Sequence, residues 1–391
     1  MTDHTELQAQ MTDWRRDFHR HPEFGFEETR TARLVAERLR GFGLEVAEGI
    51  GGTGVVGTLT RGTSNRAIAL RADMDALRIH EATGAPHASQ TAGTMHACGH
   101  DGHTAMLLGA ARLLADEGGF DGTVRFVFQP AEEWGKGALA MLADGLMERF
   151  PFDEIYGIHN LPGLGVGRFC TKPGAFMSAE DNFEITLTGS GGHASRPERT
   201  QETMVAACAL VMNLQTIVSR RLAPTDIGVV SVTEILTDGV RNALPGSARI
   251  LGDTRSFSPE VSRQIETALR RIAEGTAATF GVNVAVNYTR EFIPTVNDPE
   301  LARAALAVAT ELFGADNVTE LEAPAGGSED FARFLARVPG CFVNLGNGEA
   351  SKPLHHPGYD FDDGGLSHGA RFHAAIARAR LPASSGGNRA T

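Results

Sequence analysis

The first half of the chain alternates short apolar runs with amphipathic stretches. Residues 29–43 carry apolar side chains at helical intervals and end in glycines, which predicts an amphipathic helix. Residues 103–119 predict a second, more apolar helix, and the runs at 66–75, 123–133 and 153–160 begin as buried strands. Because strands alternate with helices, we predict an α/β fold with a mostly parallel sheet.

The pattern changes between residues 179 and 293. This segment has the order strand, helix, strand, strand, helix, strand, which is typical of a ferredoxin-like βαββαβ unit. The helix and strand patterns that follow it can only complete the first sheet. We therefore predict a discontinuous domain, 1–178 and 294–391, into which a smaller domain, 179–293, is inserted.

Composition and charge restrict the class of protein. A chain of 391 residues with 42% hydrophobic residues is long enough for two cores, and its net charge of −12 disfavours nucleic acid as a partner. It has no apolar run long enough to span a membrane and no secretory pattern at its start, so we expect a cytoplasmic protein without a membrane partner. Four cysteines are too few to stabilise a chain of this length by disulfide bonds, so we expect free thiols. The polar segment 382–391 is predicted to be disordered.

One glycine-rich motif resembles a nucleotide-binding fingerprint. The stretch GTGVVG, residues 52–57, matches G-x-G-x-x-G, which is followed by a helix in dinucleotide-binding proteins. Here an alternating β-branched run follows instead, so we predict a glycine-rich bend that enters a hairpin.

Polar side chains follow three of the predicted strands. Asp73 and Asp75 follow the first, Glu132 and Glu133 follow the second, and His159 ends the third. Because the carboxyl ends of parallel strands meet at one edge of an open sheet, where ligands bind, we expect these side chains to lie close together.

Two further segments add cysteine and histidine. Cys98 and His100 lie in the stretch MHACGHDGH, directly before the helix that we predict to begin near residue 103, and His355 and His356 lie in a loop rich in proline and glycine. Each residue alone has an ordinary structural explanation, such as a buried thiol, a hydrogen-bonded core histidine or a solvated turn. Since all of these explanations would have to hold together, we favour a metal site.

The types of side chain indicate the kind of metal. Thiolate, imidazole and carboxylate together favour Zn²⁺, Mn²⁺, Co²⁺ or Ni²⁺ over Ca²⁺ or Mg²⁺. The candidate ligands are Cys98, His100, Glu133, His159 and His355. Five ligands are one too many for a single tetrahedral zinc, so we predict two divalent ions that share one ligand. Such a pair activates a bridging hydroxide for amide hydrolysis, and Glu132 would then move the protons as general base.

Nine motifs in order carry a resemblance to a known family. They are DFHRHPEFGFEE, ALRADMDAL, MHACGHDGHTAMLLGAA, FVFQPAEE, GIHNLP, GSGGHASRP, RNALPGSARILGDTRSF, SEDF and LHHPGYDFDD. Through them the chain resembles the co-catalytic metal aminoacylases and carboxypeptidases, in the branch that contains hippurate hydrolase and the indole-acetyl-amino-acid hydrolases. The resemblance implies a catalytic α/β domain interrupted by a ferredoxin-like lid that dimerises, and hence a homodimer or homotetramer.

The resemblance also implies roles for single residues. Cys98 corresponds to the ligand shared by both metals, His100 and His159 to the ligands of one metal, and Glu133 and His355 to those of the other. Glu132 corresponds to the general base. In LHHP the first histidine, His355, aligns with the ligand, a choice that the residues alone leave open.

Residues outside this set are also assigned by resemblance. Asp75 corresponds to an acid that supports the site, whereas Asp73 stands where other branches have a metal-binding histidine. His193 corresponds to a lid histidine that reaches a neighbouring subunit's site and stabilises the oxyanion. Asn242 and Arg241 are the candidates for binding the substrate.

The activity implied is hydrolysis of the amide bond of an N-acyl amino acid. Hydrolysis of dipeptides or other small peptides is the alternative, followed by a thiol hydrolase with Cys98 as nucleophile and His100 or His103 as base, and by a metal-binding protein without catalysis. The chain departs from the branch at four positions expected around the pocket, which leaves the acyl group open. They are Arg78, Trp134, Lys136 and Glu198.

Overall fold

The computed structural model describes residues 4–383, which form two compact units. Unit 1 comprises the chain up to Gly174, Val296–Ala323, and the chain from Asp330 onward; unit 2 comprises Ala175–Thr295 and Pro324–Glu329. These limits lie a few residues from the predicted boundaries, except that 324–329, which the sequence assigned to the first domain, groups with unit 2. None of the helices described has the length and apolarity needed to cross a bilayer.

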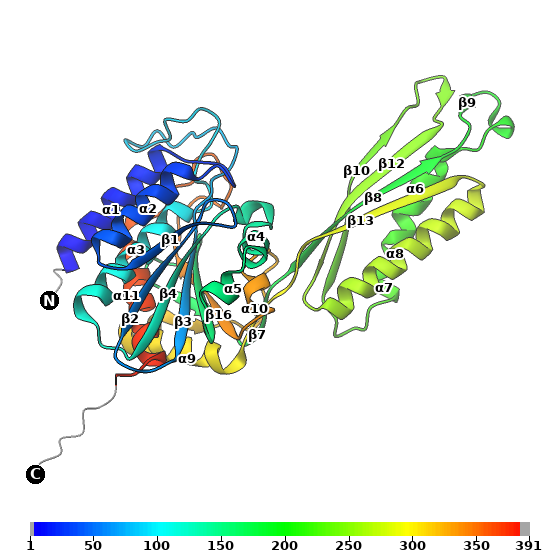
Figure 1. The fold of residues 1–391 in the computed structure, drawn as a ribbon. Helices are drawn as coiled ribbons and strands as arrows, with labels where there is room; N and C mark the ends of the chain where they lie inside the picture. Colours follow the sequence, from blue (N-terminus) through cyan, green and yellow to red (C-terminus); the bar gives the residue numbers. More distant parts are fainter. Residues whose placement is uncertain (1–3, 384–391) are drawn as a thin grey trace, which may run out of the picture. The chain divides into compact units, whose positions relative to one another are not determined.

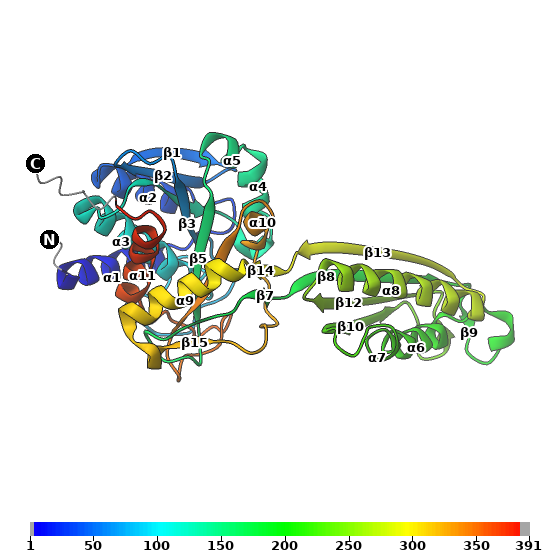
Figure 2. The same ribbon diagram turned by 90° about the horizontal axis from the view of Figure 1, so that it is seen from below.

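A mixed, mostly parallel sheet of eight strands is the framework of unit 1 (Figures 1 and 2). In spatial order its strands are β1 (Glu45–Ile50), β2 (Gly54–Arg61), β4 (Gly122–Gln129), β3 (Ala67–Asp73), β5 (Glu154–Leu161), β16 (Gly340–Gly346), β6 (Phe169–Thr171) and β15 (Val318–Glu320). The four central strands, from β4 to β16, are parallel. Their carboxyl ends therefore lie at the same edge of the sheet.

Helices cover this sheet. Those of unit 1 are α1 (His4–Arg20), α2 (Thr29–Gly41), α3 (His100–Glu117), α4 (Gly137–Ala143), α5 (Leu146–Arg149), α9 (Pro299–Phe313), α10 (Ala332–Leu335) and α11 (Leu366–Arg380). Helix α3 contacts α1, α11 and strand β3. It is buried along most of its length, which agrees with its apolar sequence.

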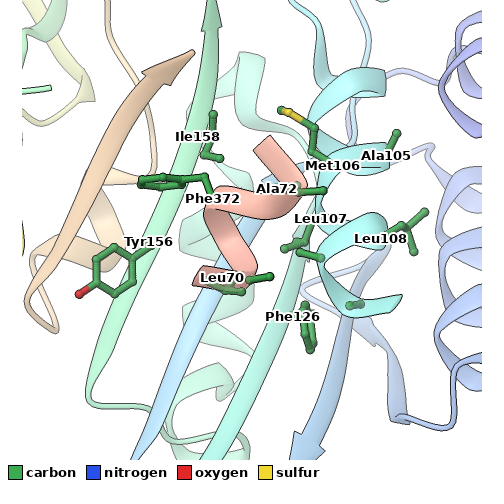
Figure 3. Close-up of a cluster of buried hydrophobic side chains, with 14 of the residues drawn as sticks. Leu70, Ala72, Ala105, Met106, Leu107, Leu108, Phe126, Tyr156, Ile158 and Phe372 are labelled. Atoms are coloured by element: carbon green, nitrogen blue, oxygen red, sulfur yellow. The ribbon is translucent and has the colours of Figure 1, made fainter. Parts of the chain in front are cut away.

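The alternation of side chains along the strands fills the core of unit 1. Leu70 and Ala72 of β3 lie with Phe126 of β4, Leu107 of α3 and Phe372 of α11 in one buried cluster (Figure 3). All of them are at most 1% exposed, and burial of a large apolar side chain contributes about 1.5–3 kcal/mol. The strand period thus fixes which side chains of β3 face α3.

Two local predictions can be compared with the structure: the hairpin after the glycine-rich bend and the first residue of α3. Strand β2 begins at Gly54 and pairs antiparallel with β1, which confirms the predicted hairpin. The prediction that α3 begins near residue 103 is wrong by three residues, because the helix begins at His100. Gly99 takes a left-handed conformation with φ 91°, and its carbonyl accepts the N–H groups of Gly102 and His103.

Unit 2 has the predicted succession of elements. They are β8 (Ala179–Thr188), α6 (Thr203–Leu214), α7 (Thr216–Arg220), β10 (Gly228–Thr237), β12 (Ser247–Ser256), α8 (Pro259–Phe280) and β13 (Asn283–Phe292). The strands form an antiparallel sheet in the order β10-β12-β8-β13, and α6 and α8 pack together against it. Two short strands, β9 (Gly192–His193) and β11 (Ala243–Leu244), pair with each other. At the limits of the unit lie β7 (Gly174–Met177) and β14 (Thr295–Asn297).

The first helical stretch of unit 2 is interrupted. The predicted order has a single helix between the first two strands of this segment, whereas α6 ends at Leu214 and α7 begins at Thr216. The Thr216 hydroxyl donates to the carbonyl of Asn213 at 2.6 Å, and such a local bond competes with regular helix. Of the segment predicted to be disordered, 382–391, residues 384–391 lie outside the described part of the chain.

Candidate metal centre

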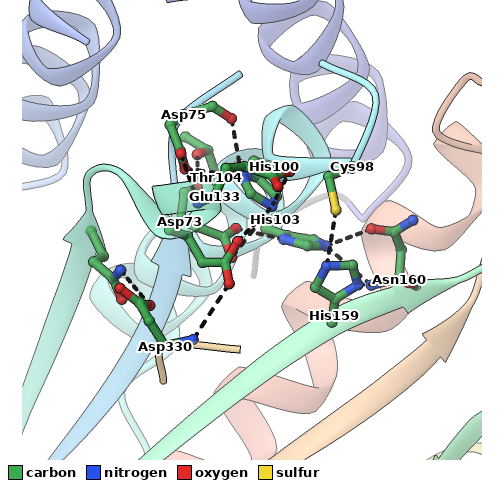
Figure 4. A network of polar contacts seen from close by, with 12 residues as sticks. Asp73, Asp75, Cys98, His100, His103, Thr104, Glu133, His159, Asn160 and Asp330 are labelled. Carbon is green, nitrogen blue, oxygen red and sulfur yellow. Dashed lines mark hydrogen bonds and ion pairs between the residues drawn. The ribbon is translucent and has the colours of Figure 1, made fainter. Parts of the chain in front are cut away.

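Three neighbouring parallel strands bring polar side chains to one edge of the sheet. Strand β3 ends at Asp73, β5 carries His159 near its end, and β4 is followed by a 3-10 turn, Glu132–Trp134. The prediction from the strand pattern is confirmed in this respect: the groups that follow separate strands meet at one place (Figure 4).

The entry into helix α3 places Cys98 and His100 at the same edge. A Cβ atom on Gly99 would lie 2.3 Å from Oδ1 of Asn160, and the φ of 91° also disfavours a side chain. Glycine between the cysteine and the histidine therefore allows the close approach to β5. His355 arrives from a loop, where its backbone has φ 63° and its N–H donates to the carbonyl of Ala97 at 2.8 Å.

The five predicted ligands form two groups of three that share one residue. Cys98, His100 and His159 make the first group, and Cys98, Glu133 and His355 make the second; in each, one donor atom per residue lies within 4.8 Å of the others. Sγ of Cys98 is 3.4 Å from Nε2 of His159, and Nε2 of His355 is 3.4 Å from Oε1 of Glu133. The five residues thus lie together in two groups that share Cys98, and their part as metal ligands stays a prediction.

The histidines offer the nitrogen that a metal ion needs. Nδ1 of His100 lies 3.1 Å from Oδ1 of Asp75 and 3.0 Å from its carbonyl oxygen, so this nitrogen donates. Nδ1 of His159 donates to the carbonyl of Asn160 at 2.7 Å. In both rings Nε2 is left to accept, and within residues 4–383 the buried Nε2 of His100 has no hydrogen-bond partner. An orphaned nitrogen beside a thiol and carboxylates fits a metal ligand with an oriented tautomer.

The electrostatics of the cluster also fit a cation. Burial raises the pKa of Cys98 well above its usual range, and the nearby charges of Glu133 and Glu132 add to the effect. Burial lowers the pKa of His159 well below its usual range. Burial also disfavours the charged form of His100, but Asp73 and Asp75 outweigh this and raise its pKa to about 10. A bound divalent ion would displace the proton from the cysteine and from His100, and it would balance the carboxylates.

Asp73 and His103 are engaged with each other and with other groups. Nδ1 of His103 lies 2.6 Å from Oδ1 of Asp73, and Arg71 donates to Oδ2 of the same carboxylate at 2.7 Å. The other nitrogen of His103 lies 2.7 Å from Oδ1 of Asn160 and 3.0 Å from its backbone nitrogen. Because both ring nitrogens of His103 are occupied, it is poorly placed to act as the base of a thiol hydrolase.

Asp75 joins two parts of the cluster. Besides its contact with His100, its Oδ2 accepts the backbone N–H of Glu133 at 3.0 Å. Glu132 is 6% exposed, and its Oε2 lies 3.9 Å from Nε2 of His100. His356, the alternative to His355, accepts the N–H of Gly358 with its Nδ1 instead.

The remaining predicted residues belong to unit 2. His193, Arg241 and Asn242 are exposed. Ala194 N–H donates to the carbonyl of Asn242 at 3.0 Å, and Nδ1 of His193 lies 2.8 Å from Oγ of Ser195. These contacts keep His193 and Asn242 close together in unit 2, and their part in the site stays a prediction.

The sequence did not assign a role to the buried network around Asp330. Its Oδ1 accepts from Arg71 at 3.2 Å and from Gln129 at 2.7 Å, and its Oδ2 accepts the N–H of Ala138. Its own N–H points to Oε1 of Glu132 at 3.4 Å. Asp330 lies in the motif SEDF, and this motif was the feature of the sequence that could have pointed to it.

Unit 1 is a discontinuous α/β unit. At one edge of its sheet, cysteine, histidine and carboxylate side chains come together, and a buried ring nitrogen among them lacks a hydrogen-bond partner in the part of the chain that the structure describes. This combination defines a metal-dependent hydrolase. Residues 69–379 match the sequence profile of peptidase family M20/M25/M40, and the chain belongs to this family. It is a metal-dependent amidohydrolase of the family, as the sequence predicted.

Three of the similar proteins show how far the likeness extends along the chain. Hippurate hydrolase of Campylobacter jejuni is 40% identical over 372 residues, covering 95% of this chain and 97% of that protein. N-acetylcysteine deacetylase of Bacillus subtilis is 36% identical over 372 residues, covering 94% and 96%. The crystal structure of a dinuclear metal-binding M20 peptidase from Bacillus subtilis has a TM-score of 0.85 and 32% identity, covering 96% of this chain and 99% of that one.

Proposed function

We propose that the protein hydrolyses the amide bond of N-acyl amino acids to a carboxylic acid and a free amino acid. The observation that carries the proposal is the pair of ligand groups that share Cys98, with Glu132 beside them. The names of the relatives support the substrate class, since hippurate hydrolase and N-acetylcysteine deacetylase both act on the acylated nitrogen of an amino acid.

Five side chains would hold two divalent ions, Mn²⁺, Zn²⁺, Co²⁺ or Ni²⁺. Cys98 would be shared, His100 and His159 would complete one site, and Glu133 and His355 the other. When bound, such a pair of ions supplies a water of lowered pKa and polarises the carbonyl of the substrate. Asp75 orients His100 and the backbone of Glu133, and so keeps both sites in one geometry.

Glu132 would be the general base. Its carboxylate is buried beside the ligands and near Nε2 of His100. It would accept a proton from the attacking water and return it to the nitrogen of the leaving amino acid. Its replacement by glutamine keeps the shape and removes the proton acceptor.

Unit 2 would be a ferredoxin-like lid and dimerisation domain. Its sheet order, β10-β12-β8-β13, supports this topology, and its edge strand β10 exposes Val229, Ile235 and Leu236. An exposed apolar edge strand favours pairing with a second copy, in a homodimer or homotetramer. In such an assembly His193 would stabilise the oxyanion in a neighbouring subunit's site, and Asn242 and Arg241 would bind the substrate. Four free cysteines within the described residues support a cytoplasmic location.

The test is a substrate screen with metal control. The full chain is stripped of metal, reloaded with Mn²⁺ or Zn²⁺, and assayed for amine release from N-acetyl and N-benzoyl amino acids and from dipeptides. We expect metal-dependent release from the N-acyl compounds, lowered by roughly 10²–10⁴-fold in Glu132→Gln. Glu148→Gln, at an exposed position of α5, is the matched control and should equal wild type.

Two results would favour a different enzymatic activity. Faster release from dipeptides than from every N-acyl amino acid would favour a dipeptidase. Activity that survives chelation and is lost on alkylation of Cys98 would favour a thiol hydrolase, although the raised pKa of this buried thiol opposes that chemistry. No metal-dependent release from any substrate, with Glu132→Gln equal to wild type, would refute the proposal.

A further inference from the structure

The turn that carries Glu132 begins with a residue in an unfavourable backbone conformation. Ala131 has φ 47° and ψ 45°, the left-handed region, and is fully buried. Among residues 4–383 only Phe26 and His355 are other non-glycine residues with positive φ. Such a conformation persists only where neighbouring groups hold it in place.

Glu28 is one of the groups that hold Ala131. It directly precedes helix α2 and is fully buried. Its Oε1 accepts the N–H of Ala131 at 2.8 Å, and its Oε2 accepts the hydroxyl of Thr53 at 2.5 Å. Both oxygens of the carboxylate thus accept a hydrogen bond, and one of these bonds comes from a backbone N–H 103 residues away in the sequence.

The peptide on the other side of Glu132 is held in the same way. Oδ2 of Asp75 accepts the N–H of Glu133 at 3.0 Å. Two buried carboxylates, from different segments, therefore fix the backbone directly before and directly after Glu132. The segment of Glu28 also packs closely here, since a Cβ atom on Gly25 would lie 3.0 Å from Cβ of Ala131.

We infer that Glu28 is a positioning residue for the reaction: by binding the N–H of Ala131 it holds the turn in which Glu132 accepts its proton. The inference rests on the proposed function of Glu132. Proton transfer depends steeply on the distance and angle of the base, so release of the turn at Ala131 lowers turnover. Glu133, the proposed metal ligand in the same turn, stays held through its N–H by Asp75. A role of Glu28 in packing alone would instead lower stability without a specific effect on kcat.

The first experiment separates these roles with three variants of the metal-loaded full chain. Glu28→Ala removes the acceptor, and we expect kcat to fall by roughly 10–100-fold with KM and metal content close to wild type. Glu28→Gln keeps one acceptor oxygen and should restore most of kcat. Glu27→Ala, at the exposed neighbouring glutamate, should equal wild type.

A double-mutant cycle tests whether Glu28 acts through Glu132. In the background of Glu132→Gln, Glu28→Ala should lower the residual rate no further, because the group that it positions is already lost. If Glu28→Ala does not fold, Thr53→Val is the milder variant: it removes the hydroxyl that orients Glu28 and should lower kcat by a few fold.

Amide hydrogen exchange gives a readout that does not need activity. The N–H of Ala131 should lose protection in Glu28→Ala and regain it in Glu28→Gln. Unchanged protection, an unchanged kcat, or a fall in kcat that is additive with Glu132→Gln would overturn the inference. A wild type that hydrolyses no substrate would refute the proposed function instead, and the exchange data would still decide whether Glu28 holds the turn.

Discussion

The buried pair of His19 and Asp101 should make unit 1 less stable at alkaline pH. Nδ1 of His19 lies 2.8 Å from Oδ2 of Asp101, and neither side chain is exposed. Burial disfavours the charged imidazole, but the charge of Asp101 and the hydrogen bonds to Asp101 and Glu81 outweigh it and raise the pKa of His19 from 6.5 to about 9. His19 is therefore protonated in the folded protein at neutral pH.

The size and sign of the effect follow from this shift. Each pKa unit corresponds to about 1.4 kcal/mol, so the protonated pair contributes about 3 kcal/mol to the free energy of unfolding. The folded state binds more protons than the unfolded state between the two pKa values. The contribution is therefore complete below pH 6.5 and is lost as the pH rises through about 9.

Urea unfolding at several pH values measures it. Both tryptophans, Trp14 and Trp134, belong to unit 1, so tryptophan fluorescence reports the unfolding of that unit. With chelator present throughout, wild type should lose about 3 kcal/mol more than His19→Gln between about pH 6 and about pH 10. His4→Gln, at an exposed position of the same helix, should keep the wild-type dependence. Parallel curves for wild type and His19→Gln would refute the reasoning.

Three further predictions concern the site and the backbone. His193→Ala should lower kcat strongly with metal content unchanged, as metal analysis beside kinetics would show; wild-type turnover would remove His193 from the site. Gly137→Ala places a Cβ atom 1.5 Å from the carbonyl oxygen of Pro130, so its melting temperature should fall and its metal affinity should weaken, and a protein equal to wild type in both would contradict this packing. Gly275→Ala, within α8 with open space around it, should raise the free energy of unfolding of unit 2 by about 0.5–1 kcal/mol, and a loss of stability would show a contact that the structure lacks.

The strand and helix patterns predicted the architecture because they reflect burial directly. Ala72 and Leu70 alternate with polar positions of β3 and pack into the core. Because the central strands are parallel, the polar residues that follow them meet at one edge of the sheet. Most of the candidate ligands could be predicted for the same reason: Glu133 and His159 stand at the ends of two strands, and Cys98 and His100 at the start of a helix, all at the same edge. His355 comes from a loop, which the strand pattern does not place.

Other features depend on contacts between distant segments, which a local pattern does not contain. The start of α3 at His100 depends on the left-handed Gly99, which lies close to Asn160 of β5. Glu28 looked like one of two adjacent glutamates before a helix, and only the fold brings it to Ala131. The grouping of 324–329 with unit 2 likewise has no signal in its own sequence.

Metal stoichiometry tests the central claim most directly. Wild type, stripped and then titrated with Zn²⁺ or Mn²⁺, should bind two ions per chain in parallel with the appearance of amidohydrolase activity. Cys98→Ala, which removes the shared ligand, should bind fewer than two and lose activity, while Cys208→Ala, at an exposed position of α6, should bind two. Two tightly bound ions in Cys98→Ala with full activity, or no metal bound by the active wild type, would contradict the account.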